Sequence, residues 1–153
     1  DWSSDVCSSD LIRYSGGKDP QHAWRYAKGA PTMSSPLLVG DELYFVSDSG
    51  GMFTCLDAHT GKEHYRERLG GNFSSSPLHA DGHIFLCNRE GTTFVLEPGK
   101  AFKLLAQSSL PGRIMATPAA VGRSLFIRTD QALYRIESPQ GGSAFLSIPI
   151  FPP

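Results

Sequence analysis

The residues best suited to chemistry in this sequence are its histidines, but they are too dispersed to form a metal site. Of the five, His79 and His83 lie four residues apart, on either side of an Asp81-Gly82 turn, and the sequence suggests no partner for His22, His59 or His64. A zinc site in a protein uses three or four side chains, so one pair of histidines is not enough. We expect both to be surface residues of a hairpin, and we predict no metal site.

The nucleophilic residue types lead to a similar expectation. Cys7, Cys55 and Cys87 form no Cys-x-x-Cys pair, and small buried thiols are common in strands. The serine runs at 34–35 and 74–76 lack the Gly-x-Ser-x-Gly pattern that presents a serine nucleophile on a sharp turn. The sequence therefore predicts no catalytic residue and favours a protein that is not an enzyme.

A repeat of 41 residues organises the chain. A Ser-Pro or Thr-Pro pair recurs at this spacing, beginning at Ser35, Ser76 and Thr117. Seven residues after each proline a short apolar run begins, at 43–46, 84–87 and 125–127. A period near 40 residues with four short strands per repeat is typical of a β-propeller blade. We therefore predict an all-β fold, a partial β-propeller of about three four-stranded antiparallel blades.

The apolar runs and the Gly- and Asp-rich turns between them locate the strands. An outermost strand of an earlier blade is predicted at 23–28. For the first blade we predict strands at 36–39, 43–47, 53–57 and 63–68. For the second we predict 78–80, 84–88, 93–97 and 102–106. For the third we predict 119–121, 125–128, 133–137 and 144–148.

Three blades fall short of the four to eight that usually close a propeller, so we expect a fragment of a longer protein. The predicted divisions are a disordered leader at 1–22, propeller blades at 23–148 and a tail at 149–153. The blades run over about 24–65, 65–106 and 106–148. Residues 1–11 show no strand or helix period and resemble a sequencing artefact, so the fold prediction leaves them out.

The turn after the third strand of the first blade has the clearest local pattern, LDAHTGK at 56–62. The carboxylate of Asp57 can accept hydrogen bonds from N–H groups two and three residues further on. Gly61 can take the left-handed conformation that a Cβ would penalise. An aromatic residue on the outermost strand would fill the gap between blades. The predicted structural motif consists of Trp24, Asp57, Thr60, Gly61, Lys62 and Tyr65.

This pattern resembles the PQQ-like propeller repeat of the quinoprotein alcohol dehydrogenase-like superfamily, over roughly 23–137. The stretch at 124–137 is similar to the last blade of such proteins, which implies a C-terminal fragment. The resemblance implies a non-catalytic binding or interaction scaffold of the bacterial cell envelope, periplasmic or extracellular. The alternative that it implies is a fragment of a PQQ-dependent quinoprotein dehydrogenase, which would use PQQ and calcium; the favoured reading has no cofactor. A WD40 propeller is disfavoured, because no Trp-Asp dipeptide ends a strand.

In a four-stranded blade, two sets of loops lie on the same face: those from second to third strand, and those from the outermost strand to the next blade. A ligand on the propeller axis would meet this face first. The loops contain Asp48, Asn72, Phe73, Arg89, Glu90, Arg113, Met115 and Asp130. From this set we predict ligand-binding residues at Asp48, Asn72, Arg89, Arg113 and Asp130. The alternative is that these are ordinary solvated loop side chains.

Composition bounds the partners. A net charge of −1 gives no broad electrostatic reason to bind nucleic acid. No apolar run approaches the roughly 18 residues of a membrane span. We expect the partners to be the remaining blades of the full-length protein and other envelope proteins, without nucleic acid and without a membrane span.

Overall fold

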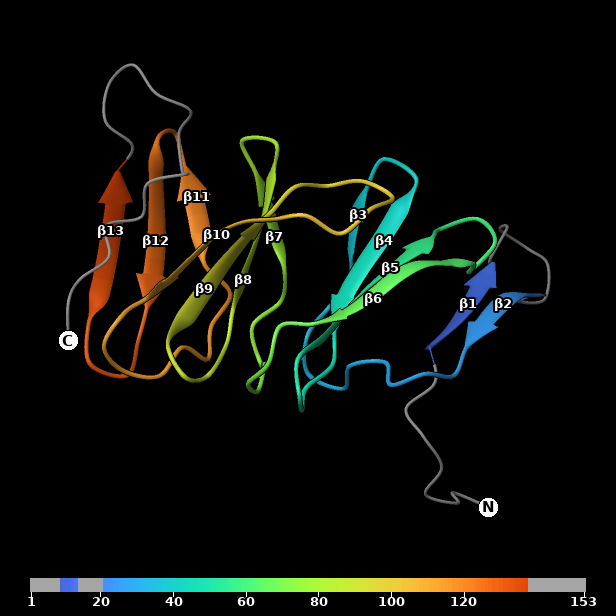
Figure 1. Cartoon of the computed structure of the whole chain (residues 1–153), viewed down its shortest axis with the longest axis horizontal. Coiled ribbons are helices and arrows are strands. Elements are labelled where there is room, and N and C mark those ends of the chain that lie inside the picture. Colours follow the sequence, from blue (N-terminus) through green and yellow to red (C-terminus); the bar gives the residue numbers. More distant parts are fainter. Residues whose placement is uncertain (1–8, 14–20, 138–153) are drawn as a thin grey trace.

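The computed structural model describes residues 9–13 and 21–137, and every regular element within these ranges is a β-strand (Figure 1). This confirms the all-β prediction. The strands are β1 (Ser9–Arg13), β2 (Gln21–Tyr26), β3 (Leu37–Val39), β4 (Glu42–Val46), β5 (Met52–Asp57), β6 (Glu63–Arg68), β7 (Leu78–Ala80), β8 (His83–Cys87), β9 (Thr92–Leu96), β10 (Leu104–Ser109), β11 (Ala119–Val121), β12 (Ser124–Arg128) and β13 (Leu133–Glu137).

The strands form consecutive antiparallel sheets, each a simple meander. β1 pairs with β2; β3–β6 form the first sheet, β7–β10 the second and β11–β13 the third. The sheets follow one another along the molecule in chain order, from β1 at one end to β13 at the other (Figure 1). This series of similar sheets is the arrangement of a partial propeller. The strand predicted at 144–148 lies outside the described residues.

The cores of the molecule lie between neighbouring sheets. Phe53 and Tyr65 of the first sheet pack in one cluster with Ile84 and Phe94 of the second. A separate cluster joins the second sheet to the third, and a smaller one joins β2 to the first sheet. Because β4 and β8 each contact a different neighbouring sheet on each face, their side chains are apolar in both directions rather than alternating.

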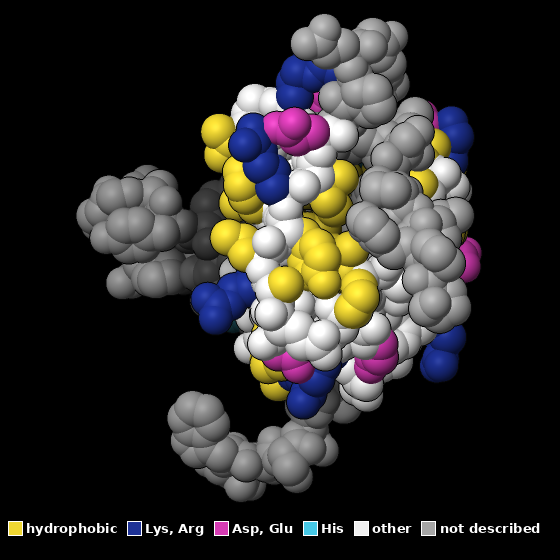
Figure 2. Space-filling model, turned by 90° about the vertical axis from the view of Figure 1, so that its left-hand side faces the viewer, with side chains coloured by type: hydrophobic (Ala, Val, Ile, Leu, Met, Phe, Trp, Pro, Cys, Tyr) yellow, Lys and Arg dark blue, Asp and Glu magenta, His cyan; other side chains and the backbone are white. Residues whose placement is uncertain are grey.

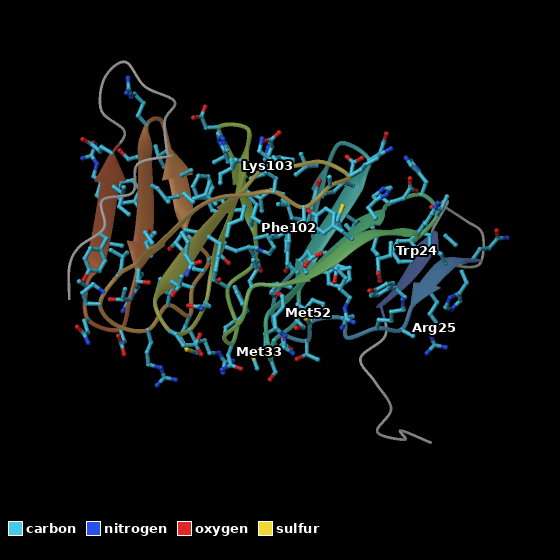
Figure 3. All side chains as sticks on the ribbon, viewed as in Figure 1. Trp24, Arg25, Met33, Met52, Phe102 and Lys103 are labelled. Carbon is cyan, nitrogen blue, oxygen red and sulfur yellow. The ribbon has the colours of Figure 1, made fainter. Side chains whose placement is uncertain are left out.

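A buried tyrosine fastens the first sheet to the second. The hydroxyl of Tyr44 accepts a hydrogen bond from the Gly99 N–H at 2.7 Å and donates one to the Gly99 carbonyl at 3.3 Å. The ring of Phe102, labelled in Figure 3, meets Tyr65 edge-on with centroids 5.8 Å apart. The turn between β9 and β10 therefore packs over the first sheet, and burial raises the pKa of Tyr44.

Two boundary predictions are corrected. The expected disordered leader at 1–22 is wrong at Ser9–Arg13, which forms β1 and pairs with β2. Backbone pairing makes this strand, and the side-chain pattern gives no sign of it. The strand expected at 102–106 begins at Leu104 instead, because a hydrogen bond from the Glu97 N–H to the Lys103 carbonyl closes a longer turn. The leader is also wrong at Gln21 and His22, which begin β2. Residues 1–8 and 14–20 and the tail at 149–153 lie outside the described residues.

The part of the chain that the structure describes contains no helix long and apolar enough to cross a membrane.

Candidate binding face

The loops predicted to share a face do lie together, along the lower edge of Figure 1. We call this surface the loop face; its loops are 27–36, 47–51, 69–77, 88–91, 110–118 and 129–132. Backbone hydrogen bonds link the loops. The Phe73 N–H donates to the Asp48 carbonyl at 2.9 Å, and the Arg89 N–H to the Asn72 carbonyl at 2.7 Å. Met33 projects at this edge of the molecule (Figure 3).

Asp48 holds the loop that enters the first sheet. Its carboxylate accepts hydrogen bonds from the backbone N–H groups of Thr32, at 2.8 Å, and Met33, at 3.2 Å, and from the Thr32 hydroxyl. Partial burial alone would raise the pKa of Asp48, but these hydrogen bonds outweigh it and lower the pKa. Asp48 is therefore ionised and committed to the loop.

A carboxylate has the same task in each later sheet. Glu90 accepts hydrogen bonds from the Asn72 backbone N–H at 3.1 Å and from the Asn72 side-chain amide at 3.0 Å. Asp130 accepts one from the Arg113 N–H at 2.8 Å. For Glu90, as for Asp48, hydrogen bonds overcome the effect of burial and lower the pKa. The carboxylates of this face therefore hold adjacent loops in position.

Most of the predicted ligand-binding residues make hydrogen bonds that hold the loops. These are Asp48, Asn72, Asp130 and Arg89, whose side chain donates to the Ser74 hydroxyl of the neighbouring loop. Arg113 lines a pocket at the third sheet. Of the other residues in the predicted set, Phe73 is wrong as a surface residue: it is fully buried and packs against Phe94 with ring centroids 6.1 Å apart. An aromatic residue next to an inner strand can point into the core, and spacing alone does not give its direction.

The exposed part of the loop face combines methionine with arginine. Met33 and Met115 are 58% and 52% exposed, and they occupy equivalent positions two repeats apart. Between them, Arg89 donates a hydrogen bond to the Ser74 hydroxyl at 2.5 Å and lies 3.0 Å from the sulfur of Met33. Arg113 and Met115 line a pocket at the third sheet. Met33 is not among the binding residues predicted from the sequence, although it lies two repeats before Met115 and could have been found from that spacing.

The turn motif lies on the opposite side of the first sheet. One Asp57 carboxylate oxygen accepts hydrogen bonds from the backbone N–H of His59 at 3.1 Å and of Thr60 at 2.8 Å, and from the Thr60 hydroxyl at 2.8 Å. The Lys62 N–H donates to the Thr60 hydroxyl at 3.3 Å. The Thr60 side chain, with help from the backbone, lowers the pKa of Asp57. These contacts are all local and serve the turn.

Trp24 of β2 packs on this turn from the neighbouring sheet. Its indole N–H donates to the Ala58 carbonyl at 3.0 Å. Gly61 has a φ of +69°, and a Cβ added there would lie 2.6 Å from Cδ2 of Trp24. The packing of Trp24 therefore requires glycine at position 61. A larger residue there would push the indole ring away from the turn.

Hydroxyl groups before the prolines link the inner strands of successive sheets. The Ser35 N–H donates to the Ser76 hydroxyl at 2.8 Å, and the Ser76 N–H donates to the Thr117 hydroxyl at 2.8 Å. This chain of contacts gives the 41-residue repeat a physical reason, because each repeat supplies the acceptor for the one before. We call it the hydroxyl ladder.

Among the described residues, no group of three or more His, Cys, Asp or Glu side chains comes together as the ligands of a metal ion would, and the loop-face carboxylates are separated, one to a sheet. His79 lies opposite Ile84 and His83 opposite Ala80, so the two histidines project from opposite faces of the hairpin. They cannot form the pair that their sequence positions allowed.

Solved structures with this architecture define the class of protein. BamB from Moraxella catarrhalis superposes with a TM-score of 0.58 at 10% identity, over 74% of this chain and 33% of that one. A europium-containing methanol dehydrogenase superposes with a TM-score of 0.52 at 18% identity, over 60% of this chain and 19% of that one. At these identities the likeness shows the fold alone, a PQQ-like β-propeller.

Sequence comparison gives the family. A family model described as outer membrane protein assembly factor BamB matches residues 17–103, and the chain belongs to this family. The outer membrane protein assembly factor BamB of Burkholderia pseudomallei (strain K96243) is 30% identical over 114 residues, 72% of this chain and 29% of the relative. The chain thus spans about a third or less of the length of these BamB relatives.

Proposed function

We propose that the protein is a non-catalytic interaction scaffold of the bacterial cell envelope, periplasmic or extracellular, that takes part in assembling outer membrane proteins. Its family and its relative are described as outer membrane protein assembly factors, which supports this role. The remaining blades of the full-length protein and other envelope proteins are its proposed partners. No cofactor is part of the proposal.

The observation that carries the proposal is the row of Met33, Arg89, Arg113 and Met115 on the loop face, in which Arg89 is half-buried and the other three are exposed. Methionine and arginine are enriched at protein–protein interfaces, and a flexible thioether adapts to different partner surfaces. The carboxylates behind this row fix the loops, so the row is presented on a pre-organised surface. A partner with acidic and apolar side chains suits it best.

The test is a paired charge reversal in the full-length protein. Arg89→Glu with Arg113→Glu should reduce the recovery of cross-linked envelope proteins about tenfold or more, as expected for the loss of two interface arginines. The matched control is Lys62→Glu with Lys100→Glu, which makes the same charge change on loops of the opposite side. Equal recovery with both double variants would contradict the proposal.

The second candidate function is that of a PQQ-dependent dehydrogenase, of which this chain would be a part. The fold likeness to a methanol dehydrogenase is the reason to consider it. Adding PQQ and calcium to the full-length protein and measuring dye-linked alcohol oxidation separates the two functions. Turnover above a protein-free control would favour the dehydrogenase over the scaffold.

A further inference from the structure

The third sheet covers its neighbour with one face and leaves the other without a neighbouring sheet among the described residues. Leu125, Ile127 and Ile136 pack toward the second sheet. Phe126 lies directly opposite Arg135 across β12 and β13, so both side chains are on the other face. Figure 2 views the molecule from this side, with apolar side chains at its centre and charged ones around them.

One arginine on this outward face occupies a position that is buried in the earlier sheets. Arg128 follows Cys87 by one repeat and Val46 by two. Val46 and Cys87 are both fully buried, the first in the core between the first and second sheets and the second in the next core. Arg128 therefore stands where the chain twice places an apolar or weakly polar residue that the following sheet covers.

The two arginines of this face differ in their surroundings. Arg135 is ion-paired with Glu137, donates a hydrogen bond to the Ser124 hydroxyl at 3.1 Å, and lies 5.8 Å from the centre of the Phe126 ring. Arg128 is exposed and has no hydrogen-bond or ion-pair partner in the part of the chain that the structure describes. Arg135 therefore has its polar partners within the third sheet, whereas Arg128 has none among the described residues.

We propose that a further sheet of the full-length protein covers this face and places a carboxylate opposite Arg128. Val121 and Leu133 are 68% and 69% exposed here, so a covering sheet would bury apolar surface, as it does at both earlier boundaries. An apolar cover alone would leave Arg128 buried without a counter-charge, which is strongly unfavourable. The chain spans only 29% of its relative, and that relative is long enough to include further sheets.

The experiment replaces Arg128 in the full-length protein with the residue of an earlier repeat, Arg128→Val. The proposal expects the melting temperature to fall by several degrees, because the carboxylate would lose its counter-charge. Arg128→Lys should restore most of the loss. Arg68→Val, at the exposed end of an outermost strand, is the matched control and should leave the melting temperature unchanged.

An unchanged or raised melting temperature for Arg128→Val would overturn the proposal, since solvent, a separate partner or a purely apolar sheet would then face this position. If Arg128→Val does not fold, Arg128→Met retains much of the side-chain stem. Failure of Met with folding of Lys supports the requirement for charge, whereas folding of Met at the parent melting temperature refutes it. This experiment measures the melting temperature, whereas the proposed function is tested by partner binding at the loop face. Failure of one proposal can therefore be distinguished from failure of the other.

Discussion

At the scale of single residues, several carboxylates of the described residues hold backbone in place. Asp57 and Asp48 both accept hydrogen bonds from N–H groups that would otherwise face solvent. The first serves a turn and the second joins two loops, yet the chemistry is the same. Only Asp57 could be assigned its contacts from the sequence, because its donors lie within three residues along the chain. The donors of Asp48 are brought to it by the fold.

Gly61→Ala should destabilise the protein more than Gly82→Ala. Both glycines have a φ near +70°, but an added Cβ meets Trp24 only at Gly61 and nothing within 4 Å at Gly82. The left-handed backbone alone is worth roughly 1–2 kcal/mol, and forcing atoms into a packed contact adds about 1–3 kcal/mol. Urea unfolding of both variants measures the difference. Equal losses would show that the indole contact is unimportant.

Acid should weaken the fold through the carboxylates whose pKa is lowered. In Asp48 the folded pKa lies below the unfolded value of about 3.9. The stabilisation is therefore complete above the unfolded pKa and is lost as the pH falls through the folded one. Asp48→Asn should show a smaller loss of the free energy of unfolding than the parent between about pH 5 and pH 3. Parallel pH profiles would argue against this role.

At the scale of elements, pattern and structure agree where a strand is apolar on both faces. The runs at 43–46, 84–87 and 125–127 fall in β4, β8 and β12. Cores on both faces explain the runs in β4 and β8, whereas in β12 only Leu125 and Ile127 enter a core. Pattern and structure disagree at β1, which has no comparable signal, and at β10, whose start depends on a turn longer than its sequence suggests. The sequence also does not predict which way a loop side chain points. Phe73 lies in a loop, yet its side chain is fully buried in the core.

The hydroxyl ladder gives a test of how sheets are joined. Ser76→Ala removes the acceptor for the Ser35 N–H and should lower the free energy of unfolding by about 0.5–1.5 kcal/mol. Ser49→Ala, in an exposed loop of the same face, should change it by less than about 0.5 kcal/mol. Chemical denaturation of both variants is sufficient. A loss no larger than that of the control would mean that water replaces the hydroxyl.

At the scale of the whole molecule, the fold explains why the site was only partly predictable. Repeat spacing places the loops on one face, and the structure agrees. Which loop side chains remain exposed is decided by packing and hydrogen bonds between loops, so Arg89 and Met33 could be selected only once the neighbours were known. Whether a partner binds them stays a prediction.

The hairpins on the loop face shorten along the chain. The closing hydrogen bond joins Ser47 to Met52 in the first sheet, Asn88 to Thr92 in the second and Thr129 to Ala132 in the third, one residue fewer each time. The ladder of hydroxyl groups nevertheless keeps its 41-residue spacing. Changes in the length of these hairpin loops are thus compensated within each repeat before the chain reaches the next inner strand. New contact surfaces can evolve in the hairpin loops while the inner strands keep their geometry.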